Sequence, residues 1–234
     1  MSSQQPLVVV SGATGVQGGS VVNALLASGK HRVRALTRRP ESDQAKALAA
    51  KGADVFKADL SNREDVKNAL NGADIAFIAT NFWDPSIFPN NMAGEERQGK
   101  MIADVAKEVG LNWLFYSSLP DTPNYKIVQF YGKNRVEKYI STLGILNVTI
   151  VYVGFYASNL GQLYPVVTKD DGTSDFIIPM VKEDTPIEII DAETDTGAIV
   201  AKVIEEGPEK WNGKKIPVVS ERISFGKIAE ILTK

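Results

Sequence analysis

Three glycines near the amino terminus, Gly12, Gly15 and Gly18, are spaced to hold the phosphates of a nucleotide. They lie between an apolar segment, residues 7–11, and a helix-like segment, residues 16–30, which is the context that a dinucleotide-binding turn requires. There the first glycine permits a tight bend, the second lets the backbone approach a pyrophosphate, and the third lets helix and strand pack closely. The turn predicts a dinucleotide site at a helix amino terminus, although a purely structural turn would use the same glycines.

The residues after the second predicted strand, 32–37, indicate which dinucleotide binds. An acidic side chain here would hold the 2′-hydroxyl of NAD, whereas an arginine would hold the 2′-phosphate of NADP. Arg38 lies twenty residues after Gly18, with Arg39 beside it, and no carboxylate stands at this point. A guanidinium matches the geometry of a phosphate. The sequence therefore predicts NADP(H), with the alternative that both arginines are solvated surface side chains.

Two further strand ends are expected to face the same cleft, because ligands of open α/β sheets bind beyond the carboxyl ends of the strands. Asp59 and Leu60, at the end of the third predicted strand, are placed to bracket an adenine ring, although Asp59 equally suits a helix cap. Thr80 and Asn81 end the fourth predicted strand and are expected to face the ribose and phosphates.

The elements that must position these residues alternate along the chain. Ser61 and Glu64 are predicted to form a capping box that opens a helix running to Gly72. Continuous apolar strands that alternate with amphipathic helices predict an α/β protein with a doubly wound parallel sheet, the Rossmann fold. The predicted strands are residues 7–11, 32–37, 54–60, 74–80, 112–118 and 147–155, and the last helix of this series is predicted at 131–144.

The pattern loosens after Gly154. A turn signal at Asp171 and Gly172 predicts a loop or hairpin, followed by a mixture of short strands and helices. We therefore predict an NADP(H)-binding Rossmann domain over residues 1–154 and a small C-terminal α/β lobe, on the substrate or partner side, over residues 155–234.

Composition limits the other classes of function. The 26 lysines and arginines are balanced by 28 acidic residues without a basic run, so neither direct nucleic-acid binding nor a membrane surface is predicted. The chain has no cysteine, and its one histidine, His31, is expected at the surface, so no metal site is predicted. With no disulfide and no targeting or membrane segment in the sequence, the expected location is the cytoplasm, with the nucleus as a second compartment.

Seven segments occur in the order found in the NmrA-like family of atypical short-chain dehydrogenase/reductase relatives. They are VSGATGVQGGSVV, RALTRRP, TNFWD, RQGKMIADVAKEVGL, LFYSS, GKNRVEKYI and GFYASNL. The sequence resembles this family over nearly its whole length, and TNFWD and RQGK resemble its human NADPH-sensing branch more than its fungal regulators. Members usually run longer than 234 residues, so the resemblance implies that part of the C-terminal lobe is absent.

The resemblance also implies a set of cofactor-binding residues. NADP(H) would contact Gly12, Ala13, Thr14, Gly15, Val16, Gln17, Arg38, Asp59, Thr80, Asn81 and Phe82. By the same match the nicotinamide side would be lined by Arg97, Lys133, Tyr156, Ala157, Ser158 and Asn159.

The catalytic pair of short-chain dehydrogenases is missing. Those enzymes use a tyrosine as proton donor, with a lysine four residues later that lowers its pKa. Here Gln129 stands four residues before Lys133, and Tyr131 projects from another side of the helix. Ser117 and Ser118 suit the serine position of such enzymes, but a serine without its tyrosine is no acid. Lys133 is expected to contact a ribose hydroxyl; in reductase relatives such a lysine would instead polarise a carbonyl or deliver a proton.

An intact cradle without its catalytic tyrosine predicts a regulatory protein that senses NADPH and NADP. The dinucleotide would reorder residues 81–94 and change homodimer formation or the binding of a protein partner, either a regulator or an enzyme. The alternative is an NADPH-dependent reductase of the quinone or isoflavone-reductase-like type that uses Lys133. A third interpretation is a scaffold indifferent to redox state. Aromatic side chains expected near the nicotinamide of a reductase are Phe82, Trp83, Phe155 and Tyr156.

Overall fold

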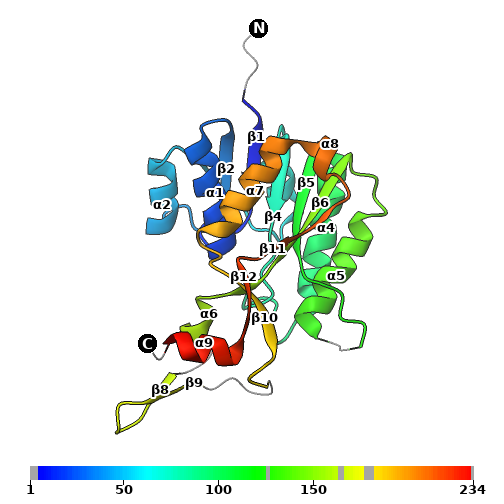
Figure 1. Cartoon of the computed structure of the whole chain (residues 1–234). Coiled ribbons are helices and arrows are strands. Elements are labelled where there is room, and N and C mark those ends of the chain that lie inside the picture. The colour runs from blue at the N-terminus through cyan, green and yellow to red at the C-terminus, as the bar shows by residue number, and fades with distance from the viewer. Residues whose placement is uncertain (1–4, 125–126, 163–165, 177–181, 233–234) are drawn as a thin grey trace.

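The computed structural model describes residues 5–124, 127–162, 166–176 and 182–232 (Figure 1). Its central sheet has seven parallel strands in the order β11-β6-β5-β4-β1-β2-β3. Every residue of β1, β4 and β5 is buried, which is why these segments are almost continuously apolar. The strands are β1 (Leu7–Val10), β2 (Arg32–Thr37), β3 (Asp54–Lys57), β4 (Ile75–Ile78), β5 (Trp113–Ser118), β6 (Asn147–Val153) and β11 (Lys215–Val218).

Helices cover both faces of this sheet. One layer consists of α1 (Val16–Ser28), α2 (Asp43–Ala50) and α7 (Asp195–Glu206), and the other of α3 (Arg63–Leu70), α4 (Gly94–Glu108) and α5 (Val128–Ile140). Val8 and Val10 pack into the first layer and Val9 into the second, as the alternation of a strand requires. The predicted Rossmann fold is therefore confirmed. No helix in the described ranges has both the length and the apolar character needed to cross a membrane.

The predicted capping box at the start of α3 is wrong. The N-cap is Asn62, whose side-chain oxygen accepts hydrogen bonds from the amides of Glu64 and Asp65 at 2.9 and 3.3 Å. The amide of Ser61 instead donates to Asp59 at 2.8 Å, in the turn that precedes the helix. Asparagine and serine are equally suited to capping, so the sequence alone does not separate two adjacent candidates.

Two element boundaries in the structure differ from those predicted from the sequence. The helix predicted from residue 131 begins at Val128, and the strand predicted over 147–155 is divided at Gly154. Gly154 donates to the carbonyl of Val218 in β11, after which the chain pairs with another sheet. The carbonyl of Glu188 passes so close to Gly154 that a Cβ would be crowded there.

Some of the described elements after residue 154 belong to the main sheet and the helices that cover it. Within this range α7, α8 (Pro208–Trp211) and β11 return to the Rossmann core, where β11 pairs with β6. The other elements gather at the end of the molecule opposite the start of β1 (Figure 1). They are the sheet β12-β10-β7, the hairpin β8–β9 predicted at Asp171–Gly172, and two helices: β7 (Phe155–Tyr156), α6 (Asn159–Gln162), β8 (Val166–Thr168), β9 (Ser174–Phe176), β10 (Pro186–Ile190), β12 (Glu221–Ser224) and α9 (Phe225–Leu232).

The division into domains 1–154 and 155–234 stays a prediction, but the sheet is not confined to its first part. The sequence pattern after Gly154 includes a helix and a strand whose partners lie far back in the chain. Nothing local marks them as Rossmann elements, because their hydrophobic periodicity would suit a separate lobe equally well.

Candidate dinucleotide site

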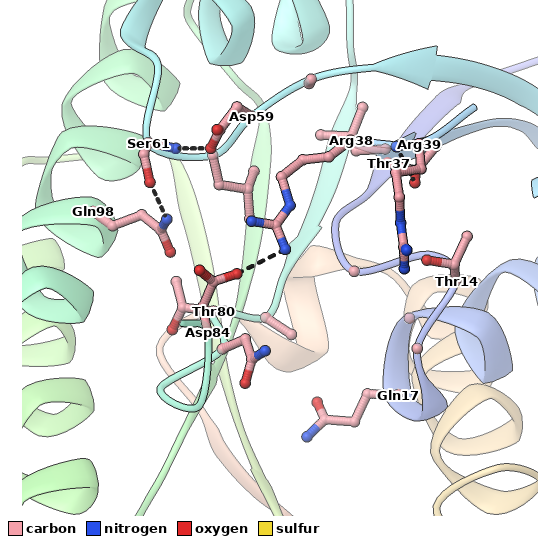
Figure 2. Close-up of a pocket in the computed structure, with 18 of the residues that line it drawn as sticks. Thr14, Gln17, Thr37, Arg38, Arg39, Asp59, Ser61, Thr80, Asp84 and Gln98 are labelled. Atoms are coloured by element: carbon pink, nitrogen blue, oxygen red, sulfur yellow. Dashed lines mark hydrogen bonds and ion pairs between the residues drawn. The ribbon is translucent and has the colours of Figure 1, made fainter. Parts of the chain in front are cut away.

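A cavity of about 410 Å³ lies at the carboxyl ends of β1, β2, β3 and β4 (Figure 2). The strand order reverses between β1 and β4, which is where open α/β sheets bind their ligands. The lining residues come from the glycine turn, three strand ends, α4 and β7. They are Gly12, Thr14, Gly15, Val16, Gln17, Gly18, Leu36, Thr37, Arg38, Arg39, Ala58, Asp59, Leu60, Ser61, Ala79, Thr80, Asn81, Asp84, Gln98 and Tyr156.

The glycine turn is built to receive a phosphate. Gly12 has φ +59°, a conformation that side chains disfavour, and a Cβ on Gly18 would overlap the carbonyl of Gly12. Gly15 is the N-cap of α1, yet no side chain caps this helix and its first turn carries no acidic residue. The helix amides and the positive end of its dipole are therefore available to an anion. These residues fit the pyrophosphate of a dinucleotide.

The two arginines after β2 point in different directions. The amide of Arg39 donates to the hydroxyl of Thr37 at 3.1 Å, so the chain bends directly after the strand. Arg38 reaches across the pocket to Asp84, with Nη2 and Oδ2 2.7 Å apart, whereas the Arg39 side chain runs toward Thr14 (Figure 2). Burial raises the pKa of Asp84, but hydrogen bonds from the hydroxyl and amide of Ser86 and the contact with Arg38 outweigh it, and the net pKa is lowered.

The opposite wall is a chain of polar side chains. Asp59 accepts a hydrogen bond from the Ser61 amide at 2.8 Å, and the Ser61 hydroxyl accepts one from Gln98 at 2.9 Å. The amide of Asp59 donates to Asp65 at 2.9 Å, which fixes the turn between β3 and α3. Asp59 and Leu60 thus line the pocket beside the end of β3, and their contact with an adenine stays a prediction.

Gln17, which lines the pocket, links the start of α1 to β7 and β5. Its side-chain nitrogen donates to the hydroxyl of Tyr156 on β7, and its oxygen accepts from Ser117 on β5 at 2.8 Å. Burial raises the pKa of Tyr156, with the hydrogen bond to Gln17 acting in the other direction. A raised pKa makes this phenol a weaker acid, and a tyrosine that donates protons in catalysis needs the reverse.

Lys133 does not line the pocket, and each hydrogen of its ammonium group has an acceptor. Its Nζ is 2.8 Å from Glu95 Oε1, and it donates to the Thr80 hydroxyl at 2.8 Å and the Thr80 carbonyl at 3.0 Å. The Thr80 hydroxyl in turn donates to Glu95 Oε1 at 2.8 Å, and the Glu95 side chain is 0% exposed. A lysine ammonium has three hydrogens, and these contacts use all three. The sequence does not indicate that Glu95 takes part in the site, because the three residues of this network, Thr80, Glu95 and Lys133, come from different parts of the chain.

Most predicted cofactor residues line the pocket, but several do not. Ala13 is buried beneath the turn, and Phe82 is buried against Trp83 and Phe88, with ring centroids 5.2 and 5.5 Å away. Arg97 is exposed and donates to Asn91. The remaining residues outside the lining are Lys133, described above, Ala157 and Ser158, exposed after β7, and Asn159, the first residue of α6.

Some residues that line the pocket were not predicted from the sequence. Leu36, Ala58 and Ala79 lie at strand ends, so the rule that found Thr80 would also have found them. Asp84 and Gln98 carry no such signal, since one lies in a loop and the other on an outer helix.

Comparisons with known proteins show what this chain is similar to. The model of the NmrA-like family matches residues 4–234. The NmrA-like family domain-containing oxidoreductase cpsB of Aspergillus campestris is 34% identical over 98% of this chain and 72% of its own length. The nitrogen metabolite repression protein nmrA of Emericella nidulans is 33% identical over 96% of this chain and 64% of its own length.

Solved structures of NmrA, a negative transcriptional regulator, are similar to the whole fold. One matches with a TM-score of 0.86 and 29% identity, covering 98% of this chain and 71% of the other. Two others, in complex with NADP and with NAD, each match with a TM-score of 0.82 and 30% identity, covering 95% of this chain and 69% of the other.

Proposed function

This chain belongs to the NmrA-like family, and from that premise we propose that it is an NADP(H)-binding regulatory protein. The pocket at the switch point, the uncapped amino terminus of α1 and the two arginines after β2 support dinucleotide binding. The NmrA structures in complex with NADP and with NAD support it as well. Within the family, the likeness to the human NADPH-sensing branch stays a prediction.

The contacts of the Lys133 ammonium with Glu95 and Thr80 are the observation that favours a regulator over an enzyme. A lysine that polarises a substrate carbonyl needs a free hydrogen-bond donor directed into the pocket. Lys133 instead gives its three hydrogens to Glu95 and Thr80 and does not line the pocket. Tyr116, which lies near this group, is no substitute acid, because burial and then the charge of Glu95 raise its pKa.

Residues 81–94, which lie between β4 and the first residue of α4, are the segment that we propose to transmit binding. Asn81 and Asp84 line the pocket, whereas Trp83 and Met92 are 59% and 44% exposed. A dinucleotide that changes the position of Asp84 would therefore change an apolar surface. We propose that this surface serves self-association as a homodimer or a protein partner, and that NADPH and NADP differ in their effect on it.

The second candidate is an NADPH-dependent reductase. The name of the relative cpsB, an oxidoreductase, favours it. In that case NADPH supplies a hydride, while Lys133 would have to leave Glu95 to reach a carbonyl. The molecule that accepts the hydride would then be oriented by the hydrogen-bonded side chains of Tyr156, Gln17 and Ser117.

The test is NADPH oxidation, followed by absorbance against a panel of quinones and aldehydes, with NADPH binding measured separately by titration. We expect binding without turnover above that of Lys133→Ala. Because Lys133→Ala leaves the Glu95 carboxylate buried without its partner, Glu95→Gln/Lys133→Met provides a second variant without that charge.

The results either decide between the two candidates or reject both. Turnover that disappears in both variants would make the protein a reductase. Absence of NADPH binding by the wild type would reject both functions.

A further inference from the structure

We infer that Asn71 is a site of spontaneous deamidation, and that the fold protects Asn212, which is also followed by glycine. In this reaction the amide nitrogen of the glycine forms a bond to the asparagine Cγ, and the bond from Cγ to Nδ2 breaks. Nδ2 leaves as ammonia with the proton that the glycine amide gives up. Water then opens the resulting succinimide ring, which leaves an aspartate or an isoaspartate.

The site lies away from the pocket. Asn71 is the C-cap of α3 and precedes β4, whereas the pocket lies beyond the carboxyl ends of the strands. The inference therefore goes beyond the proposed function and does not depend on dinucleotide binding.

The two Asn–Gly pairs of the chain have nearly the same local structure. Asn71 has φ −60° and ψ 125°, and Asn212 has φ −60° and ψ 135°. The glycines that follow, Gly72 and Gly213, have φ +72° and +71°. These values match the two central residues of a type II turn, where the second position favours glycine. All four residues are exposed, so neither the local conformation nor exposure separates the pairs.

Tertiary contacts hold the second pair. The side-chain oxygen of Asn212 accepts a hydrogen bond from the amide of Val148 in β6 at 2.9 Å. The amide of Gly213 donates to the carbonyl of the same valine at 2.7 Å. The attacking nitrogen and the side chain that it must reach are thus both bound to a strand of the central sheet. Both hydrogen bonds must break, in a local opening of the chain, before the reaction can occur.

The first pair lacks these contacts. Across the ranges that the structure describes, neither the Asn71 side chain nor the Gly72 amide forms a hydrogen bond. Arg34 donates to the Asn71 carbonyl at 3.5 Å, which involves neither reacting group.

The backbone hydrogen bonds around the two turns are equivalent. The amides of Asn71 and Asn212 donate to the carbonyls four residues earlier, at 3.0 and 2.8 Å. Each turn is closed by a bond from the residue after its glycine, at 3.0 Å for Ala73 and 3.2 Å for Lys214. The contacts with Val148 are therefore the difference on which the protection of Asn212 rests.

The experiment is incubation at mildly alkaline pH, once in buffer and once in urea that unfolds the chain, followed by peptide mapping with mass spectrometry. In the folded protein, Asn71 should deamidate at least about tenfold faster than Asn212, because two further hydrogen bonds must break at Asn212. In the unfolded chain, the two rates should be similar, because each asparagine is followed by a glycine, which has no side chain to hinder the attack.

Two variants serve as matched controls for each other. Each deamidation replaces a neutral amide by a carboxylate, so ion-exchange chromatography of the incubated folded protein should separate more acidic forms. Asn71→Ser should remove most of these forms, whereas Asn212→Ser should leave them at the level of the wild type.

Equal rates in the folded protein, a faster reaction at Asn212, or no reaction at Asn71 would each overturn the inference. A difference that persists in urea would overturn it as well, because the neighbours in sequence, and not the fold, would then be its cause.

Discussion

At the scale of single residues, Glu95 decides what Lys133 can do. The carboxylate is fully buried, and Lys133, whose side chain is 12% exposed, is its one ion-pair partner among the described residues. Breaking a buried ion pair from one side is costly because the remaining charge stays without compensation. The pair therefore binds α4 to α5 and removes the lysine from the pocket.

This arrangement predicts a large loss of stability on Glu95→Gln. We expect the free energy of unfolding, measured by urea denaturation, to fall by about 3 kcal/mol. The control is Glu108→Gln on the same helix, which loses surface pairs with Arg63 and Lys67 at 2.5 and 2.7 Å. It should cost no more than about 1 kcal/mol. Equal effects of the two variants would mean that Lys133 is free to move into the pocket.

At the scale of elements, α7 shows how a distant segment completes the Rossmann core. It packs across α1 at a close approach, where the amide of Gly197 donates to the Ser20 hydroxyl at 2.8 Å (Figure 1). A Cβ at Gly197 would overlap the carbonyl of Ser20. The two helices can be this close only because one of them has no side chain at the crossing.

Gly197→Ala should therefore destabilise the protein, by about 1–3 kcal/mol, as overpacking does. The melting temperature should fall by roughly 2–4 °C for each kcal/mol. Gly132→Ala, in α5, is the matched control, because its Cβ would meet nothing nearer than Glu95 Oε2 at 3.9 Å. That change should be neutral or stabilising, since alanine favours a helix. A Gly197→Ala melting temperature equal to that of Gly132→Ala would rule out the close crossing.

At the scale of the whole molecule, residues from both ends of the chain meet around His31. This histidine, expected at the surface from the sequence, is partly buried, and its Nδ1 lacks a hydrogen-bond partner among the described residues. Desolvation lowers its pKa from the ordinary 6.5, with Glu205 of α7 opposing and Lys30 adding to the effect. Lys30 and Glu205 also form an ion pair at 2.9 Å, which joins the first helix region to α7.

A lowered pKa makes this histidine a source of acid sensitivity. Well above pH 6.5 it is neutral in both the folded and the unfolded chain, and its contribution to stability is complete. As the pH falls, the unfolded chain takes up the proton first, so stability is lost until the folded pKa is passed. Between about pH 7.5 and about pH 5.5, the urea midpoint of the wild type should fall more than that of His31→Gln. Parallel curves for the two proteins would contradict this assignment.

The sequence by itself determined the glycine turn, the alternation of buried strands and helices, and the pair of arginines after β2. These are local properties: a φ of +59° at Gly12, an apolar period and a position at a strand end are set by residues close together in the chain. Local rules therefore predicted the Rossmann sheet and most of the pocket wall.

Only the tertiary structure decided how these parts are used. It placed β11 and α7 in the core, Glu95 beneath Lys133, and Asp84 against Arg38 but not Arg39. Two adjacent arginines are equivalent in a sequence, and a lysine is the same whether its ammonium is free or paired. The difference lies in charges that folding brings to within 3 Å from distant positions. For Lys133 and Glu95, burial also makes the interaction strong.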